Sequence, residues 1–311
     1  DFCLSRGLGD VYKRQDQSGS ARGEPLRTVH DLAEKVGRIE ALDGVSKPVA
    51  DGVKSALGRG VAKDALSGTW LGHSLHPMLT DIPIGSFTSA TIIDFLGGKK
   101  GRNAADLLVA VGILSSIPTA AAGLADWSDT FGEPQRMGVI HAAANAVGLA
   151  FYGISLVHRR RGNRIRGAAL SLAGMGAMTV GGYLGGHLSY SRGIGVNNAF
   201  HEEQPEDWTP VIEESALTDG TPVKVDAGGA SLLVYRKDGR ITAIGARCTH
   251  AGGPLDEGEV DTAACTVTCP WHQSEFRLDD GSVVHGPATV PQPAYDVRVE
   301  GGKVEVRRRQ A

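Results

Sequence analysis

The chain has 311 residues, a formal net charge of −3 at pH 7 and four cysteines. This length allows two domains, each with its own core, and the nearly neutral charge gives no indication of nucleic-acid binding. Four cysteines are too few for a disulfide-stapled scaffold. The mean hydropathy of −0.12 averages an apolar middle with polar ends, so it conceals two different kinds of sequence.

The first 15 residues, DFCLSRGLGDVYKRQ, begin with Asp1 rather than methionine and resemble translated sequencing adaptor. We interpret residues 1–15 as a non-native leader and exclude Cys3 from any site. Residues 16–70 are predicted to be helical and amphipathic, because apolar residues from Leu26 to Ile39 recur at helical spacing. Charges of both signs balance there, so we expect a packing or interfacial helix rather than an anchor for anionic lipids.

Residues 71–195 contain four apolar segments and predict an α-helical transmembrane four-helix bundle. The segments cover about 79–98, 105–125, 137–157 and 167–188. The third has 21 residues without a charge, enough to cross about 30 Å of hydrocarbon. The first is weaker because it contains Asp81, Pro83 and Asp94. A soluble bundle is the alternative, but the segments lack a polar face and are rich in small residues, as helices packed in lipid are.

A motif at the start of the bundle supports this topology. His73-Ser74-Leu75-His76-Pro77 runs into the sequence TDIPIG at 80–85. Over about residues 65–195 the chain resembles an uncharacterised four-helix bacterial membrane family. Because that family has no settled activity, the resemblance implies a topology and not a mechanism.

The charged loops predict the orientation of the bundle. Basic residues lie between the first and second segments and between the third and fourth, at Lys99, Lys100, Arg102, Arg159, Arg160, Arg161, Arg164 and Arg166. The positive-inside rule places these loops in the cytoplasm and both termini outside. We therefore expect a multi-pass protein of the bacterial cytoplasmic membrane whose C-terminal domain is extracytoplasmic.

Histidines gather at the face of the bundle that carries both termini. His76, His141 and His187 lie in or beside the apolar segments, where an imidazole is costly unless it has a partner and often marks a site. Three ligands remain open: a b-type haem held by two histidines, a quinone or another metal. For haem, His141 and His187 are the first choice, with His76 as substitute. The alternative is that these rings only fix the packing through hydrogen bonds.

After a polar linker at 196–210, residues 211–308 are predicted to be all-β. Alternating strands flank Lys237-Asp238-Gly239, Asp279-Asp280-Gly281 and Gly301-Gly302, which are signals for hairpin turns.

Two fragments in this β region carry the strongest chemical signal of the chain. Cys248-Thr249-His250 and Cys269-Pro270-Trp271-His272 each offer one thiolate and one imidazole. This donor set suits a [2Fe–2S] cluster with two Cys on one iron and two His on the other, or a tetrahedral zinc ion. Zinc motifs usually pair like with like instead of repeating a mixed pair. The spacing C-x-H…C-x-x-H resembles the Rieske iron–sulfur family, which implies a β-sandwich with a cluster-binding subdomain.

The resemblance also implies which residues surround the cluster: Gly253, Pro270, Trp271, Ser274 and Phe276. Respiratory Rieske proteins join their loops by a disulfide, but Gly253 and Trp271 occupy the matching positions here. Ser274 keeps a hydroxyl donor to the cluster, whereas Phe276 stands where those proteins have tyrosine. The pattern is therefore similar to the ferredoxin type, with a low potential because one donor is lost. We expect Trp271 to act as an apolar cover.

These features predict a membrane-bound one-electron carrier that exchanges electrons with a redox protein or the quinone pool and lies in a lipid bilayer. The alternatives are a tethered ferredoxin that feeds a separate oxygenase or reductase, and a redox sensor. We assign no catalytic residue and leave open whether the chain is an enzyme. A terminal oxygenase is not expected, because it needs a non-haem iron domain after the Rieske module and 26 residues follow His285.

Overall fold

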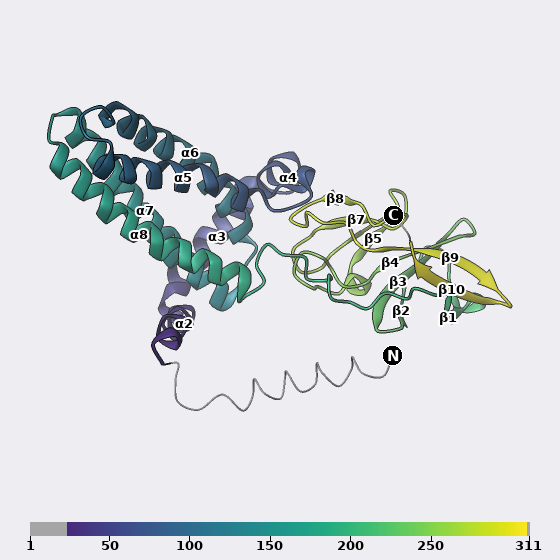
Figure 1. Cartoon of the computed structure of the whole chain (residues 1–311). Helices are drawn as coiled ribbons and strands as arrows, with labels where there is room; N and C mark the ends of the chain where they lie inside the picture. The colour runs from purple at the N-terminus through teal and green to yellow at the C-terminus, as the bar shows by residue number, and fades with distance from the viewer. Residues whose placement is uncertain (1–23, 310–311) are drawn as a thin grey trace, which may run out of the picture.

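The computed structural model describes residues 24–309, so the proposed leader at 1–15 lies outside it. A helical part is followed by an all-β part, and the β part lies at the end of the bundle where α3 and α4 are found (Figure 1). The predicted order of a helical bundle and an all-β domain is confirmed.

The amphipathic N-terminal region is divided into separate helices. These are α2 (Glu24–Gly37), α3 (Asp43–Leu57) and α4 (Val61–Ser67), with 3₁₀ turns at Glu40–Leu42 and Thr69–Leu71. The chain breaks between α3 and α4 because Gly58 and Gly60 have φ of 59° and 118°, which side-chain-bearing residues rarely adopt. α2 packs on α7, and α3 contacts both α6 and α7. The region thus covers one end of the bundle and does not extend as one helix.

The bundle in the described chain has four long helices. They are α5 (Leu75–Leu96), α6 (Arg102–Ser128), α7 (Gly132–Arg160) and α8 (Arg164–Tyr190). α5 packs along α6, and α7 packs along α8. Of the helices that the structure describes, α6, α7 and α8 are long and apolar enough to cross a membrane. α5 contains Asp81, Pro83 and Asp94, the residues that made the first predicted segment the weakest.

Small residues allow the helices of the bundle to approach closely. A Cβ at Gly112 of α6 would lie 2.5 Å from the Phe87 ring of α5, and one at Gly148 of α7 would lie 2.9 Å from the Gly174 carbonyl of α8. The outer surface of α6 is apolar, with Leu107, Leu114 and Ile117 each about two-thirds exposed. A close-packed interior with an apolar exterior is the arrangement that lipid favours.

Arg159 forms a buried ion pair at the end of the bundle remote from the β part. Its guanidinium binds the carboxylate of Asp94 in a bidentate manner and lies 3.4 Å from Asp106. The Arg159 side chain is fully buried, and Ser155 and Ser171 accept its remaining hydrogen bonds. Arg159 is therefore part of the packed bundle and not one of the solvated loop charges that the orientation argument counted.

The β part of the described chain contains two antiparallel sheets. The six-stranded sheet has the order β1-β10-β9-β4-β3-β2, and the four-stranded sheet has the order β5-β6-β7-β8. The strands are β1 (Thr209–Glu213), β2 (Val223–Ala227), β3 (Ala230–Lys237), β4 (Arg240–Gly245), β5 (Glu259–Asp261), β6 (Thr266–Thr268), β7 (Glu275–Arg277), β8 (Val283–His285), β9 (Ala294–Glu300) and β10 (Lys303–Arg308). All three predicted hairpins are confirmed, as β3–β4, β7–β8 and β9–β10.

Candidate metal centre

The two cysteine loops share one backbone conformation. They span 248–253, after β4, and 269–274, between β6 and β7. In each loop the cysteine amide donates to the carbonyl five residues later, at 2.8 Å, and the amide of the fourth residue after the cysteine donates back to the cysteine carbonyl. That fourth residue is left-handed in both loops: Gly252 with φ of 77° and Gln273 with φ of 64°. The sequence therefore places two equivalent turns opposite each other.

The two thiols of these loops face each other in the core. Cys248 and Cys269 are both 1% exposed and share a hydrogen bond. This shared proton raises the pKa of Cys248 and lowers the pKa of Cys269. The backbone amides two and three residues after each cysteine also donate to its sulfur, which favours the thiolate. No disulfide joins the cysteines of the described residues.

The two imidazoles of these loops lie next to each other. The rings of His250 and His272 have centroids 4.9 Å apart and are nearly perpendicular. His250 Nδ1 and His272 Nε2 are buried and have no hydrogen-bond partner within residues 24–309. Burial lowers the pKa of His250 to about 3, so the ring is neutral. Buried polar atoms without partners are uncommon in proteins, and neutral imidazoles are metal ligands, so this donor set fits a metal centre.

Gly253 brings the two loops into contact. A Cβ at this position would lie 2.9 Å from Cys269 Sγ and 3.1 Å from the Trp271 ring. Any larger residue would push the second loop away from the first. Trp271 lies over this glycine but is 54% exposed, so only one part of the indole covers the site.

The other predicted neighbours of the site lie on the second loop and on β7. Ser274 is fully buried, and its Oγ accepts a hydrogen bond from the Ala288 amide at 2.9 Å. Phe276 is fully buried in the core cluster that also contains both loop cysteines, whereas Pro270 is exposed. The serine hydroxyl thus accepts from the backbone and keeps its own proton for another acceptor.

The tip of the cysteine loops contacts the helical part. The His272 ring stacks on Phe131, between α6 and α7, with centroids 5.2 Å apart and 26° between the planes. Lys54 of α3 lies 4.5 Å from the centre of the same Phe131 ring. Arg59 donates from Nε to Gln273 Oε1 at 2.5 Å. Sequence reasoning did not find Phe131, because an exposed aromatic residue between two apolar segments carries no signal of its own.

Polar contacts fix the same interface on two further sides. Asp64 of α4 bonds His285 Nδ1 and accepts from the Gly286 amide, both at 2.8 Å. Asn198 lies in the linker. Its side-chain Nδ2 donates to the His250 carbonyl at 2.7 Å, and its backbone N–H donates to the Thr249 carbonyl at 2.9 Å. The first cysteine loop is therefore bonded to the linker, and the second rests on the bundle.

The histidines of the bundle pair differently from the expectation. The rings of His76 and His141 have centroids 6.4 Å apart. His187 lies elsewhere and bonds Glu34 of α2 at 2.9 Å. The structure therefore brings His141 next to His76, the expected substitute, and not next to His187, which faces α2.

His76 and His141 are held in matching ways. His76 Nδ1 bonds the Thr119 carbonyl of α6 at 2.9 Å, and His141 Nδ1 bonds the Gly181 carbonyl of α8 at 2.7 Å. Four residues beyond each carbonyl stands a glycine, Gly123 or Gly185. A Cβ at these positions would lie 2.7 Å and 3.0 Å from the respective imidazole. Each histidine thus fits a notch on the second helix of its own hairpin.

Comparisons with known proteins agree with this division of the chain. Residues 207–296 match the family model of the Rieske [2Fe-2S] domain, and residues 72–198 match the predicted membrane protein family DUF2231. The all-β fold with its paired cysteine loops is thus a Rieske domain, joined to a DUF2231 domain.

Individual relatives are similar to the Rieske part. Ferredoxin CarAc of Metapseudomonas resinovorans is 34% identical over 100 residues, which are 32% of this chain and 92% of that protein. The 3-phenylpropionate/cinnamic acid dioxygenase ferredoxin subunit of Escherichia coli (strain K12) is 34% identical over 88 residues, 28% of this chain and 81% of that protein. The solved ferredoxin of carbazole 1,9a-dioxygenase from Nocardioides aromaticivorans IC177 is 29% identical, with a TM-score of 0.32, over 33% of this chain and all of that one.

The chain belongs to the Rieske [2Fe-2S] family. Its cofactor is a [2Fe–2S] cluster, and the Rieske part is an electron carrier.

Proposed function

We propose that Cys248 and Cys269 bind one iron of the cluster and that His250 and His272 bind the other. The observation that supports this assignment is the convergence of two hydrogen-bonded thiols with two imidazoles whose buried ring nitrogens lack partners. When bound, the cluster accepts and releases one electron at a time. The loop amides that donate to both sulfurs stabilise negative charge there.

EPR spectroscopy and iron analysis of the purified full chain test this assignment. Cys248→Ser should abolish the Rieske EPR signal and the bound iron, whereas Cys265→Ser, a half-buried cysteine outside the loops, should keep both. Helical circular dichroism shows whether the bundle of each variant is folded. Zinc in place of iron in the wild-type protein, or a full Rieske signal in Cys248→Ser, would refute the assignment.

We further propose that the cluster has a potential at the low end of the Rieske range. Phe276 is fully buried in the core next to the loops and offers no hydroxyl to the cluster, while Ser274 retains one. Each lost donor to the sulfurs destabilises the reduced, more negative cluster. Phe276→Tyr should raise the midpoint potential in a redox titration, and Ser274→Ala should lower it. Unchanged potentials in both variants would contradict this proposal.

The membrane assignment is also a proposal. The apolar helices α6 to α8 and the apolar outer face of α6 support a multi-pass protein of the bacterial cytoplasmic membrane. Loop charges favour an extracytoplasmic Rieske domain, although Arg159 and Arg164 are neutralised by Asp94 and Asp106. Protease treatment of right-side-out vesicles should remove the Rieske domain. If the Rieske domain is protected in right-side-out vesicles and cleaved in inverted vesicles, the domain lies on the cytoplasmic side instead.

The matched His76 and His141 support a second redox group in the bundle. Each ring commits Nδ1 to a carbonyl and thereby leaves Nε2 unprotonated, as metal-ligating histidines do. We propose that this pair holds a b-type haem or binds a quinone that exchanges electrons with the cluster. Asn145, whose Nδ2 lies 3.3 Å from His141 Nε2, supports the competing interpretation of a purely structural pair.

A reduced-minus-oxidised spectrum of the purified protein and lipid extraction separate these cases. Haem bands that disappear in His76→Ala and His141→Ala but remain in His187→Ala indicate haem; a co-purifying quinone lost in the same variants indicates a quinone site. If neither is found, the chain is a membrane-tethered ferredoxin. Its partner is then a separate oxygenase component, as the name of the Escherichia coli dioxygenase ferredoxin subunit suggests.

A further inference from the structure

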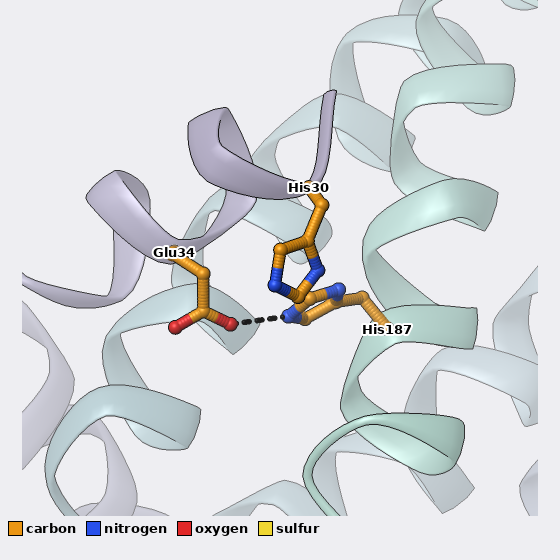
Figure 2. Close-up of side chains that lie close together, drawn as sticks. All are labelled: His30, Glu34 and His187. Carbon is orange, nitrogen blue, oxygen red and sulfur yellow. Dashed lines mark hydrogen bonds and ion pairs between the residues drawn. The ribbon is translucent and has the colours of Figure 1, made fainter. Parts of the chain in front are cut away.

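A group of metal-ligating side chains lies where α2 meets α8, apart from the cysteine loops. His30 and Glu34 are four residues apart on α2 and therefore project from the same face of that helix. His187 faces them from α8, near the C-terminal end of that helix. Figure 2 shows the two imidazoles and the carboxylate directed toward one another. One donor atom from each residue lies within 4.8 Å of the other two.

The distances between these groups suit a common ligand. Glu34 Oε1 lies 2.9 Å from His187 Nε2, and the rings of His30 and His187 have centroids 5.2 Å apart. His187 is 5% exposed and held in place by packing, whereas His30 is exposed and can turn to shorten its distance. Two imidazoles and one carboxylate form the ligand set that zinc uses when a water occupies its fourth position.

We propose that His30, Glu34 and His187 bind a divalent transition-metal ion of the zinc class. Each imidazole supplies one ring nitrogen, Glu34 supplies Oε1, and a water completes the tetrahedron. The hydrogen bond between Glu34 and His187 is replaced by two bonds to the ion. Such an ion would join α2 to the end of α8.

Arg192 orients the carboxylate for this role. Its Nη2 donates to Glu34 Oε2 at 2.5 Å and to Glu133 Oε2 at 2.8 Å. The guanidinium thus occupies one oxygen of Glu34 and leaves Oε1 directed at the histidines. Carboxylate ligands of metals are commonly held by such a hydrogen bond.

Solvent reaches the group from the side of α2. A hollow of about 380 Å³ lies beside the helix and is lined by His30, Asp31, Glu34, Lys35 and Arg38. An ion can therefore enter without opening the bundle.

Calorimetric titration of the chelator-washed full chain with zinc chloride tests the proposal, with the Rieske EPR signal used to check that the cluster is retained. We expect one saturable site. His30→Ala, at an exposed position, and Glu34→Gln should each weaken zinc binding by at least about 10–100-fold, the loss that follows removal of a group supporting a metal ligand. Co²⁺ substitution should give a tetrahedral absorption band that both variants lose.

His73→Ala is the matched control, because His73 is an exposed histidine at the same end of the bundle and bonds only the neighbouring Ser74 carbonyl among the described residues. It should bind zinc as the wild type does. Absence of saturable zinc binding in the wild type, or equal affinity in the wild type and His30→Ala, would overturn the proposal. Equal losses in His30→Ala and His73→Ala would also overturn it, as that outcome indicates nonspecific binding.

Discussion

Two pairs of histidines in this protein differ in what their ring nitrogens contact. In the cysteine loops, His250 and His272 each keep a buried nitrogen without a hydrogen-bond partner among the described residues, whereas His76 and His141 each bond a helix carbonyl through Nδ1. A buried polar atom that lacks a partner is costly, so the open nitrogens of the first pair support the proposed cluster ligation. The second pair has a structural role already and can exist with or without a ligand.

The difference follows from the backbone that carries each pair. A helix carbonyl has a second lone pair after its own hydrogen bond, and glycine one turn later leaves room for an imidazole to reach it. Gly123 and Gly185 provide that room for His76 and His141. In the cysteine loops the amides two and three residues after each cysteine donate to its sulfur, and the carbonyls of Thr249 and His250 accept from Asn198.

The largest expected effect separates the two pairs directly. His250→Ala removes a proposed ligand and should abolish the Rieske EPR signal, while His76→Ala should leave its g-values and intensity unchanged. Parallel EPR spectra and iron contents of the two variants provide the measurement. A Rieske signal of normal intensity in His250→Ala would remove the contrast between the pairs.

The next largest effect is on the free energy of unfolding and tests the buried ion pair of Arg159 in the bundle. Arg159→Met leaves the carboxylates of Asp94 and Asp106 without their buried partner and should cost about 3–5 kcal/mol of the free energy of unfolding. Arg160→Met, at an exposed position, should change it by less than about 0.5 kcal/mol. Denaturant titration in detergent measures both. Equal stabilities would mean that the buried pair contributes no net stabilisation.

A smaller effect tests the notch that holds His76. In Gly123→Ala the new methyl group lies 2.7 Å from the imidazole, so the ring must move, at a cost of about 1–3 kcal/mol. At Gly153 a Cβ would meet no atom within 4 Å from the described residues outside its own turn of helix, so Gly153→Ala should gain about 0.5–1 kcal/mol from helix propensity. Thermal unfolding of the two variants, followed by helical circular dichroism, gives the comparison. If both behave alike, packing does not fix His76.

The smallest effect is a dependence on pH. The carboxylate of Glu34 faces His187 of α8, Arg192, His30 and, through Arg192, Glu133 of α7, and its pKa is lowered chiefly by the hydrogen bond to His187.

Because the folded-state pKa is the lower one, this interaction stabilises the fold above the unfolded pKa of about 4.3 and is lost as the pH falls below it. The difference in Tm between wild type and Glu34→Gln should therefore be present at pH 7 and shrink toward pH 4. If the difference in Tm does not change with pH, the effect of Glu34→Gln comes from packing and not from the charge of the carboxylate.

Local patterns in the sequence predicted most of the fold. Turn residues such as Asp238 and Gly239 adopt the positive φ that a tight hairpin needs, so β3 and β4 could be located without any tertiary information. The spacing of the two cysteine motifs likewise predicted that four side chains meet, because each motif is a single turn between strands.

Features that depend on contacts between distant segments could not be predicted. Arg159 was counted as a loop charge, since nothing in its neighbourhood along the chain shows that Asp94 reaches it. His30 and Glu34 belong to the polar side of an amphipathic helix, which is usually solvated; only the approach of His187 from α8 makes them a group. The sequence also does not show that the ring of His76, and not that of His187, lies beside His141, because this depends on how the helices pack.

The stacking of Phe131 on His272 places the imidazole edge of the proposed cluster and the anchoring surface of the domain at one spot. An electron acceptor that approaches through His272 competes with the bundle for that edge. Asp64 and Arg59 bond the β part to the helical part beside this stack, so such an acceptor would have to displace those contacts as well. The stack that covers His272 would thus also control the access of a redox partner to that imidazole.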